Sequence, residues 1–258
     1  MPVFANAPGI EYKKLDSWKG FFDFIDGRKE DYQYIWRGQR KNSWELVSSF
    51  DRLFDTSVPV EEVEKEANKH LKRFKYVARG MIEYEDICDD SDNEMWALAQ
   101  HYGLSTPLLD WTYSPFVALF FAIHEYIEEK KIISIWGLGN LSKLNDSAKE
   151  NDLPMIKRFH PKQKKNSRLI SQNGLFTKVP FEYSVNRWVT YISKKFHKDN
   201  PAKYLYKIDI KFTPSDTIEC LMLLNRMNIN YYTLFPDAEG VTKFCDMAFK
   251  IPKYHRFW

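Results

Sequence analysis

An unbroken apolar run at residues 116–123 is the strongest constraint on how this chain can fold. Ser114 and Pro115 precede it, in the order typical of a helix N-cap and the first helical position. The run is far shorter than the roughly 20 residues that span a bilayer. A helix that is apolar on every side must be buried inside the protein. We therefore predict a buried helix at about 115–128, followed by a central strand at Lys131–Leu138.

The other helix and strand patterns follow one another without a regular β-α-β rhythm. This order favours an α+β fold, with one mixed sheet flanked by helices, over a doubly wound sheet. We expect a single domain over residues 1–258 with a core at about 18–248. Residues 139–168 are polar and irregular, which indicates a large loop or an insertion. Further helices are expected at about 17–25, 59–80, 92–102, 184–196, 215–227 and 238–249, and further strands at 32–36, 169–178, 204–210 and 231–234.

Composition narrows the class of protein. Of the 258 residues, 44% are hydrophobic and 16% are aromatic, which is enough for a sizeable core. A net charge of +3 is too small to indicate nucleic-acid binding by itself. Cys88, Cys220 and Cys245 are odd in number and not at CxxC spacing, which argues against a disulfide framework. Because the first residues also lack the features of a signal peptide, we expect a cytoplasmic protein.

The tripeptide Trp36-Arg37-Gly38 follows a strand-like segment. An arginine at the end of a strand can point into a cleft, and a glycine lets the backbone lie close to a ligand. The fixed fork of the guanidinium suits phosphate or pyrophosphate. The alternative is a surface arginine beside a turn.

Residues 100–112 are dense in side chains that titrate or form hydrogen bonds, yet they directly precede the apolar helix. Buried polar groups need partners or a function. A structural interpretation also exists for the members of this segment: His101 as a core histidine, and Asp110 as an acceptor for several donors, His101 among them. We expect Asp110 to be mainly structural, although a catalytic role stays open for both residues.

Two later segments complete the candidates. Residues 235–240 place Asp237 and Glu239 at a strand-to-helix junction, where Asp237 can cap the last helix and Glu239 can interact with its dipole. Residues 168–177 suggest a strand, a turn and a strand, with Ser171, Gln172 and Thr177 available to touch a ligand. The alternative is a hairpin with polar turn residues.

A basic stretch at residues 157–168 can contact the phosphates of a nucleic acid, although such a run is more often a solvated loop. The histidines and cysteines show no zinc spacing, so we expect no metal. The chain also has no P-loop, dinucleotide fingerprint or GxSxG motif. The basic side chains within residues 157–168 are Lys157, Arg158, Lys162, Lys164, Lys165 and Arg168.

Together these segments resemble the FRG family, a bacterial domain named for an aromatic-Arg-Gly motif. The most specific match is residues 100–112 with Ser114-Pro115 and the helix that follows. Trp36-Arg37-Gly38 carries tryptophan where phenylalanine or tyrosine is usual. Residues 168–177 and 228–240 resemble two later motifs of the family, so the resemblance covers about residues 18–248.

The order of the segments is also similar to that of ADP-ribosyltransferases, which implies a related fold and NAD as the substrate. On this resemblance Arg37 would bind NAD, and Glu239 would stabilise the positive charge that develops on the ribose. The expected catalytic residues are Glu239, His101 and Asp110, and the expected cofactor-binding residues are Arg37, Gly38, Tyr102, Thr106, Trp111, Ser171, Gln172, Thr177 and Asp237.

Three functions are compatible with these residues. The first is an NAD-consuming ADP-ribosyltransferase or NAD glycohydrolase, a toxin or phage-defence effector acting on a protein or nucleic-acid acceptor. The second is a module that senses a nucleotide or a phage component without turnover. The third is a metal-independent nuclease with His101 and Asp110 as acid and base. We predict that Arg37, His101, Asp110 and Glu239 lie around one cleft.

Overall fold

A mixed sheet forms the centre of the protein in the computed structural model, which describes residues 7–28, 34–79, 91–125, 127–161, 167–197 and 203–254. Seven strands are described, in the order β1-β7-β4-β2-β3-β6-β5. Only β1 and β7 run parallel, and the other neighbours are antiparallel. The strands are β1 (Ile10–Leu15), β2 (Ile35–Gln39), β3 (Leu108–Thr112), β4 (Lys131–Leu138), β5 (Lys157–Phe159), β6 (Gly174–Lys178) and β7 (Leu205–Phe212).

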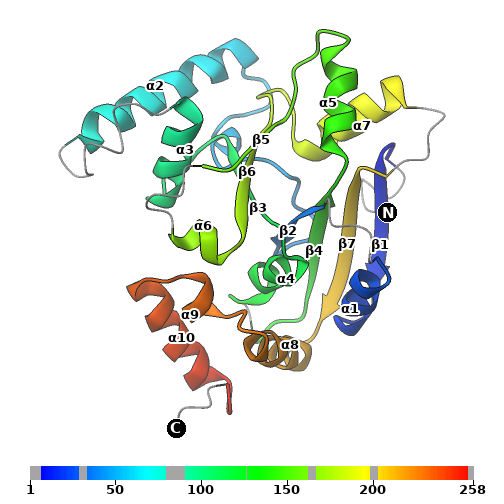
Figure 1. The fold of residues 1–258 in the computed structure, drawn as a ribbon, viewed down its shortest axis with the longest axis vertical. Coiled ribbons are helices and arrows are strands. Elements are labelled where there is room, and N and C mark those ends of the chain that lie inside the picture. Colours follow the sequence, from blue (N-terminus) through cyan, green and yellow to red (C-terminus); the bar gives the residue numbers. More distant parts are fainter. Residues whose placement is uncertain are drawn as a thin grey trace.

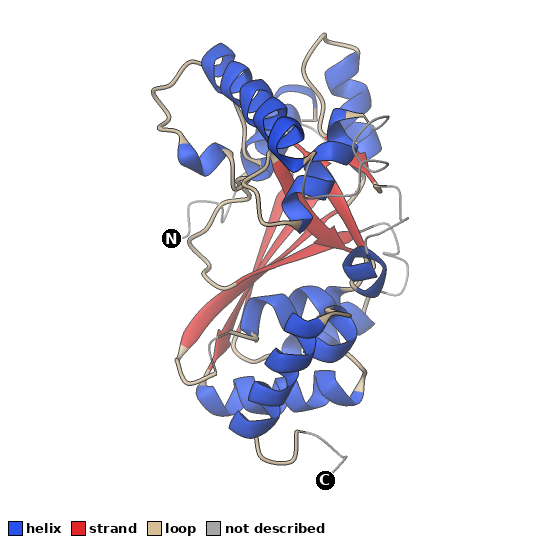
Figure 2. Cartoon of the chain, turned by 90° about the vertical axis from the view of Figure 1, so that its left-hand side faces the viewer, coloured by secondary structure: helices blue, strands red, loops and turns tan. Residues whose placement is uncertain are grey.

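Helices cover both faces of this sheet, so the fold is α+β with the sheet between two helical layers (Figure 2). One layer contains α1 (Lys19–Asp26), α4 (Pro115–Ile123), α8 (Pro214–Arg226), α9 (Tyr231–Leu234) and α10 (Ala238–Lys250). The other layer contains α2 (Val60–Ala78), α3 (Asp92–His101), α5 (Leu141–Lys149) and α7 (Val185–Phe196), which lie in the upper part of Figure 1. The short η1 (Asp51–Leu53) comes between β2 and α2 in the chain, and the short α6 (Ser167–Ser171) comes between β5 and β6. No helix among the described residues has both the length and the apolar character needed to cross a membrane.

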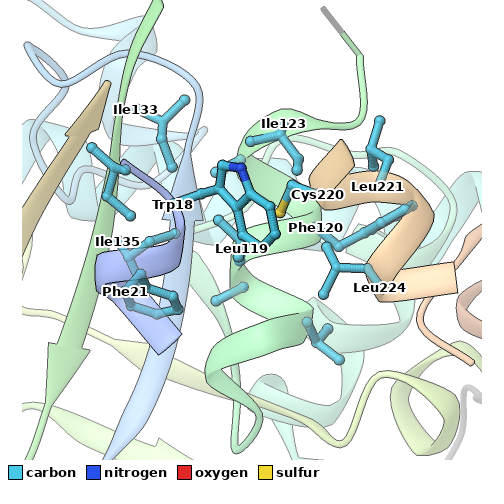
Figure 3. Packing of buried hydrophobic residues seen from close by; sticks show 14 of the residues in the cluster. Trp18, Phe21, Leu119, Phe120, Ile123, Ile133, Ile135, Cys220, Leu221 and Leu224 are labelled. Carbon is cyan, nitrogen blue, oxygen red and sulfur yellow. The ribbon is translucent and has the colours of Figure 1, made fainter. Parts of the chain in front are cut away.

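Helix α4 is the centre of the larger core, as its sequence predicts. Ser114 caps it by accepting a hydrogen bond from the backbone N–H of Val117, and Pro115 occupies its first turn. The helix is packed between the sheet and α8, and the predicted central strand is β4 (Figure 3). The apolar side chains labelled in Figure 3 come from α1 and its N-cap, α4, β4 and α8: Trp18, Phe21, Leu119, Phe120, Ile123, Ile133, Ile135, Cys220, Leu221 and Leu224.

Gly38 lets α4 approach β2 very closely. A Cβ atom at this position would lie 1.8 Å from the carbonyl oxygen of Ala118, a distance that no side chain can tolerate. Trp36 points to the same face of β2 as Gly38, where it is buried against α4. The glycine of the Trp-Arg-Gly motif is therefore required for packing. Because side chains alternate between the two faces of a strand, Arg37 points to the opposite face from Trp36 and Gly38.

Three predicted elements were wrong. Residues 139–168 are not one irregular loop, because Leu141, Leu144 and Ala148 give α5 a buried face and β5 adds an edge strand. Residues 167–171 form α6 rather than a strand, and Asn173 in the left-handed conformation (φ 48°) turns the chain into β6. Residues 231–234 form α9, because Asn230 and Thr233 make a reciprocal capping box that favours a helical turn.

Helix α8 begins at Pro214, close to the expected start at 215. Its cap is Thr213, which also forms a capping box with Asp216. Cys220 is a buried free thiol and Cys245 an exposed one, whereas Cys88 lies outside the described residues.

A buried histidine joins α4 to α9 and should make stability depend on pH. His124 shares a hydrogen bond with the hydroxyl of Tyr231, and burial, followed by the charge of Arg40, lowers the pKa of His124 to about 3. The unfolded chain binds a proton at this residue near pH 6.5, whereas the folded protein does not until about pH 3. The stabilising contribution is therefore complete above pH 6.5 and is lost as the pH falls through this window.

Between pH 7.5 and pH 5, the wild type should lose about 2 kcal/mol more free energy of unfolding than the variant His124→Gln, which has no imidazole to titrate. Urea denaturation at several pH values measures the difference between the two proteins. Parallel stability curves over this range would show that His124 is not held neutral by the fold.

Candidate functional site

A cavity of about 810 Å³ opens where β2 and β3 separate. These two strands pair only at Trp36 and Thr112, whereas β2 pairs with β4 along its whole length. The cavity is lined by residues of β2 and the loop after it, α3, β3, α4, α6 and the segment before α10. Of the predicted site residues, the structure brings six to its wall: Arg37, Gly38, His101, Asp110, Trp111 and Gln172.

Arg37 bridges the two strands at the point where their pairing ends. Its Nη1 donates to the backbone oxygen of Asp110 at 2.7 Å and lies 3.4 Å from the Oδ2 of the same residue. Its Nε is buried and has no hydrogen-bond partner among the described residues. One edge of this guanidinium is therefore fixed by the protein while its Nε retains an unused N–H group.

Arg52, in η1, is a cavity residue that the sequence did not suggest. Its Nη1 donates to the backbone oxygen of Val47 at 2.8 Å. Burial lowers the pKa of Arg52, and the nearby positive charge of Arg37 lowers it further. Two guanidinium groups thus lie close enough to repel each other in the wall of one cavity. Arg52 belongs to none of the polar motifs of the sequence, so no local signal marks it.

Asp110 presents its carboxylate to the cavity instead of burying it. The side chain is 61% exposed. Its Oδ1 accepts a hydrogen bond from Nε2 of Gln100 at 2.6 Å, and Gln100 in turn accepts one from the hydroxyl of Thr106. The predicted buried network with His101 as a donor is therefore wrong, because among the described residues Gln100 and Arg37 fill that role. Thr106 does not line the cavity but orients Gln100.

His101 ends α3 and lines the cavity, half-buried. Burial lowers the pKa of His101, the positive charge of Arg168 lowers it further, and Asp237 opposes this effect. The imidazole is consequently neutral at pH 7 and can accept a proton. Tyr102 packs edge-to-face on it at 5.2 Å but is 60% exposed and lies outside the cavity wall.

The polar residues of segment 168–177 mainly connect the strands and loops around the cavity. Nε1 of Trp111 donates to the fully buried hydroxyl of Thr177 at 2.8 Å, which joins β3 to β6. Nε2 of Gln172 donates to the backbone oxygen of Leu234 at 3.1 Å. Ser171 belongs to α6 and does not line the cavity. Neither Thr177 nor Ser171 therefore lies in the cavity wall.

Arg168 connects the cavity to α10. Its Nε donates to Oδ2 of Asp237 at 2.5 Å, and its Nη2 donates to Oε2 of Glu239 at 2.7 Å. Asp237 also accepts from the backbone N–H of Gly240 at 3.0 Å, so its predicted role as helix cap is confirmed. The other oxygen of Glu239 binds Lys243 at 2.6 Å.

We predicted that four residues, Glu239 among them, lie around one cleft, and the structure places three of the four there. Arg37, His101 and Asp110 line one cavity, as predicted. Glu239 is not among the lining residues, and it reaches the cavity only through Arg168. Hydrogen bonds from Lys243 and then Arg168 lower the pKa of the Glu239 carboxyl, so it remains ionised within these ion pairs.

Part of the predicted basic stretch can be placed. Lys157 and Arg158 are exposed on the edge strand β5, and Arg168 faces the cavity. Lys162, Lys164 and Lys165 lie outside the described residues. Over the described ranges, no group of three or more His, Cys, Asp or Glu side chains is arranged to hold a metal ion.

Residues 32–131 match the FRG domain family. The chain is thus similar to an FRG domain over these residues, which make up less than half of its length. The match includes the Trp-Arg-Gly motif, residues 100–112 and helix α4, and it ends at the start of β4. The segments around Arg168 and Asp237 lie outside it. No curated protein and no solved structure gave a significant match to the chain.

The two carboxylates at the start of α10 should contribute differently to stability. Asp237→Ala should lower the free energy of unfolding by about 1–2 kcal/mol, because the helix loses its cap and Arg168 loses a partner. Glu239→Gln should cost less than about 1 kcal/mol, since only half-exposed ion pairs are weakened. Asp246→Ala, an exposed acid on the same helix, serves as the control in chemical denaturation. A larger loss for Glu239→Gln than for Asp237→Ala would contradict this assignment.

Proposed function

We propose that this protein binds the phosphates of a nucleotide in the cavity between β2 and β3, with NAD as the ligand. The observation that carries this proposal is the pair of neighbouring guanidinium groups, Arg37 and Arg52, in the cavity wall. Two like charges close together destabilise a protein unless an anion offsets them.

The rest of the cavity fits a nucleotide better than a free phosphate ion. Its volume of about 810 Å³ lies within the range of small-molecule and cofactor sites. Aromatic side chains and amides share the wall with the charged groups, and these provide flat apolar surfaces and hydrogen bonds for a base and a ribose. The aromatic and amide residues of the wall are Trp36, Trp44, Trp111, Phe121, Phe176, Phe235, Gln39, Gln100 and Gln172.

Cleavage of bound NAD is the second candidate function, and the exposed carboxylate of Asp110 favours it. When the bond between nicotinamide and C1′ of the ribose breaks, the electron pair leaves with nicotinamide and positive charge develops on the ribose. An ionised carboxylate in the same cavity would stabilise that charge. The neutral imidazole of His101 would accept the proton of the water or acceptor group that adds to C1′.

This proposal assigns to Asp110 the role that resemblance to ADP-ribosyltransferases gave to Glu239. Both oxygens of Glu239 accept hydrogen bonds from cationic side chains, one from Arg168 in the cavity wall and the other from Lys243. A carboxylate held in this way is less able to respond to charge that develops on a ligand. Glu239 would instead position Arg168.

The binding proposal predicts that Arg37→Ala and Arg52→Ala each weaken NAD binding by about tenfold or more, since each removes a charge-assisted hydrogen bond. Isothermal titration calorimetry with NAD, ADP and inorganic pyrophosphate gives the three affinities. Arg73→Ala, a change to an exposed arginine of α2, is the matched control and should bind as wild type. If the wild-type protein has no measurable affinity for any of the three compounds, the binding proposal is wrong.

The cleavage candidate predicts that Asp110→Asn binds NAD but releases nicotinamide about a hundredfold more slowly than wild type. Glu239→Gln should remain within a few-fold of wild type. Nicotinamide release is followed by chromatography, with melting curves for both variants as the folding control. Loss of release in Glu239→Gln alone would return the catalytic role to Glu239. A wild type that binds NAD without releasing nicotinamide would be a nucleotide-sensing module.

A further inference from the structure

Trp44 is an exposed tryptophan in the cavity wall, in the loop between β2 and η1. Its side chain is 40% exposed, and it lines the same cavity as Arg37 and Arg52. The exposed part of this indole is available to a molecule that enters the cavity. The other described tryptophans are all at most 6% exposed: Trp18, Trp36, Trp96, Trp111, Trp136 and Trp188.

The loop that carries Trp44 is fixed by the residue that follows it. The carboxylate of Glu45 accepts two hydrogen bonds from Arg187, both at 2.9 Å, and another from Ser184 at 3.0 Å. The backbone oxygen of Glu45 accepts one from Gln39 at 3.0 Å. These hydrogen bonds hold the backbone next to the exposed indole in place. Trp44 would therefore lose little conformational entropy when it binds a ligand.

Two cationic groups lie over this indole at the outer limit of a cation–π contact. The guanidinium of Arg40 is 5.6 Å from the ring centroid of Trp44, and the ammonium of Lys41 is 5.8 Å away. Arg40 also forms an ion pair with Glu125 across the cavity wall. An aromatic surface between cationic groups suits a planar base that is linked to phosphates.

We propose that Trp44 stacks on the base of the nucleotide whose phosphates are held by Arg37 and Arg52. This inference rests on the proposed binding function and adds to it the position of the base. It makes Trp44 a residue that distinguishes nucleotides from other phosphate compounds. The arginines recognise the phosphates alone, so the two contributions are separable by the choice of ligand.

The experiment compares ADP with inorganic pyrophosphate, which share two linked phosphates and differ in the nucleoside. Trp44→Ala should weaken ADP binding about five- to hundredfold, the range for removing one aromatic partner from a base. The same variant should bind pyrophosphate within about twofold of wild type. Trp44→Phe should recover most of the ADP affinity, because it restores a ring. Calorimetry gives the affinities, and Phe249→Ala, a change to a ring that is 91% exposed on α10, is the control.

The other outcomes overturn the proposal in distinguishable ways. Unchanged ADP affinity in Trp44→Ala would mean that the indole does not contact the base. An equal loss for ADP and pyrophosphate would mean that Trp44 supports the phosphate site instead. A wild type that binds pyrophosphate as tightly as ADP would leave the phosphate site intact and remove the base site. A wild type that binds neither compound would reject the proposed function, and this inference with it.

Discussion

The contact between Gly38 and the backbone of Ala118 is the constraint on which the site depends. Since a Cβ atom at position 38 would lie 1.8 Å from the Ala118 carbonyl oxygen, only glycine allows α4 to rest on β2. That contact fixes the face of the strand that is buried, with Trp36 and Gly38 toward the helix. Arg37, between them, is thereby directed away from α4, where it reaches Asp110 across the gap between β2 and β3. The packing of Gly38 against α4 thus sets the direction in which Arg37 points.

The guanidinium groups around the cavity differ in how closely carboxylates offset their positive charge. Arg168 has two carboxylate partners, Asp237 and Glu239, and it anchors α10. Arg37 and Arg52 instead make their short hydrogen bonds to backbone oxygens. Each has one carboxylate nearby, Asp110 for Arg37 and Asp51 for Arg52, and the two guanidinium groups repel each other. Arg37 contacts the Asp110 carboxylate only at 3.4 Å. The positive charge near β2 is therefore the less compensated part of the wall, and an anion would gain most there.

Sequence patterns predicted the helices and strands that are marked by a local signal, such as a long apolar run or a capping residue. Helix α4 and strand β4 follow from long apolar runs, and α10 from a capping aspartate. Polar segments such as α5 were missed because only three buried side chains mark the buried face. In the site, Arg37, His101 and Asp110 stood in dense polar motifs, whereas Arg52 and Trp44 come from an ordinary-looking loop. Their place in the cavity depends on long-range contacts, such as that between Glu45 and Arg187, which no local pattern reveals.

The position of a carboxylate relative to its cations decides whether it can act on a ligand. Glu239 lies in the first turn of α10, and each of its oxygens accepts a hydrogen bond from a cation, so its negative charge is already offset. Asp110 accepts a hydrogen bond of 2.6 Å from the neutral amide of Gln100 and a longer one, of 3.4 Å, from Arg37, and 61% of its side chain is exposed. Its negative charge is therefore offset less closely than that of Glu239. The same exposure limits what the ion pair between Arg37 and Asp110 can contribute to the free energy of unfolding, because solvent screens exposed charges.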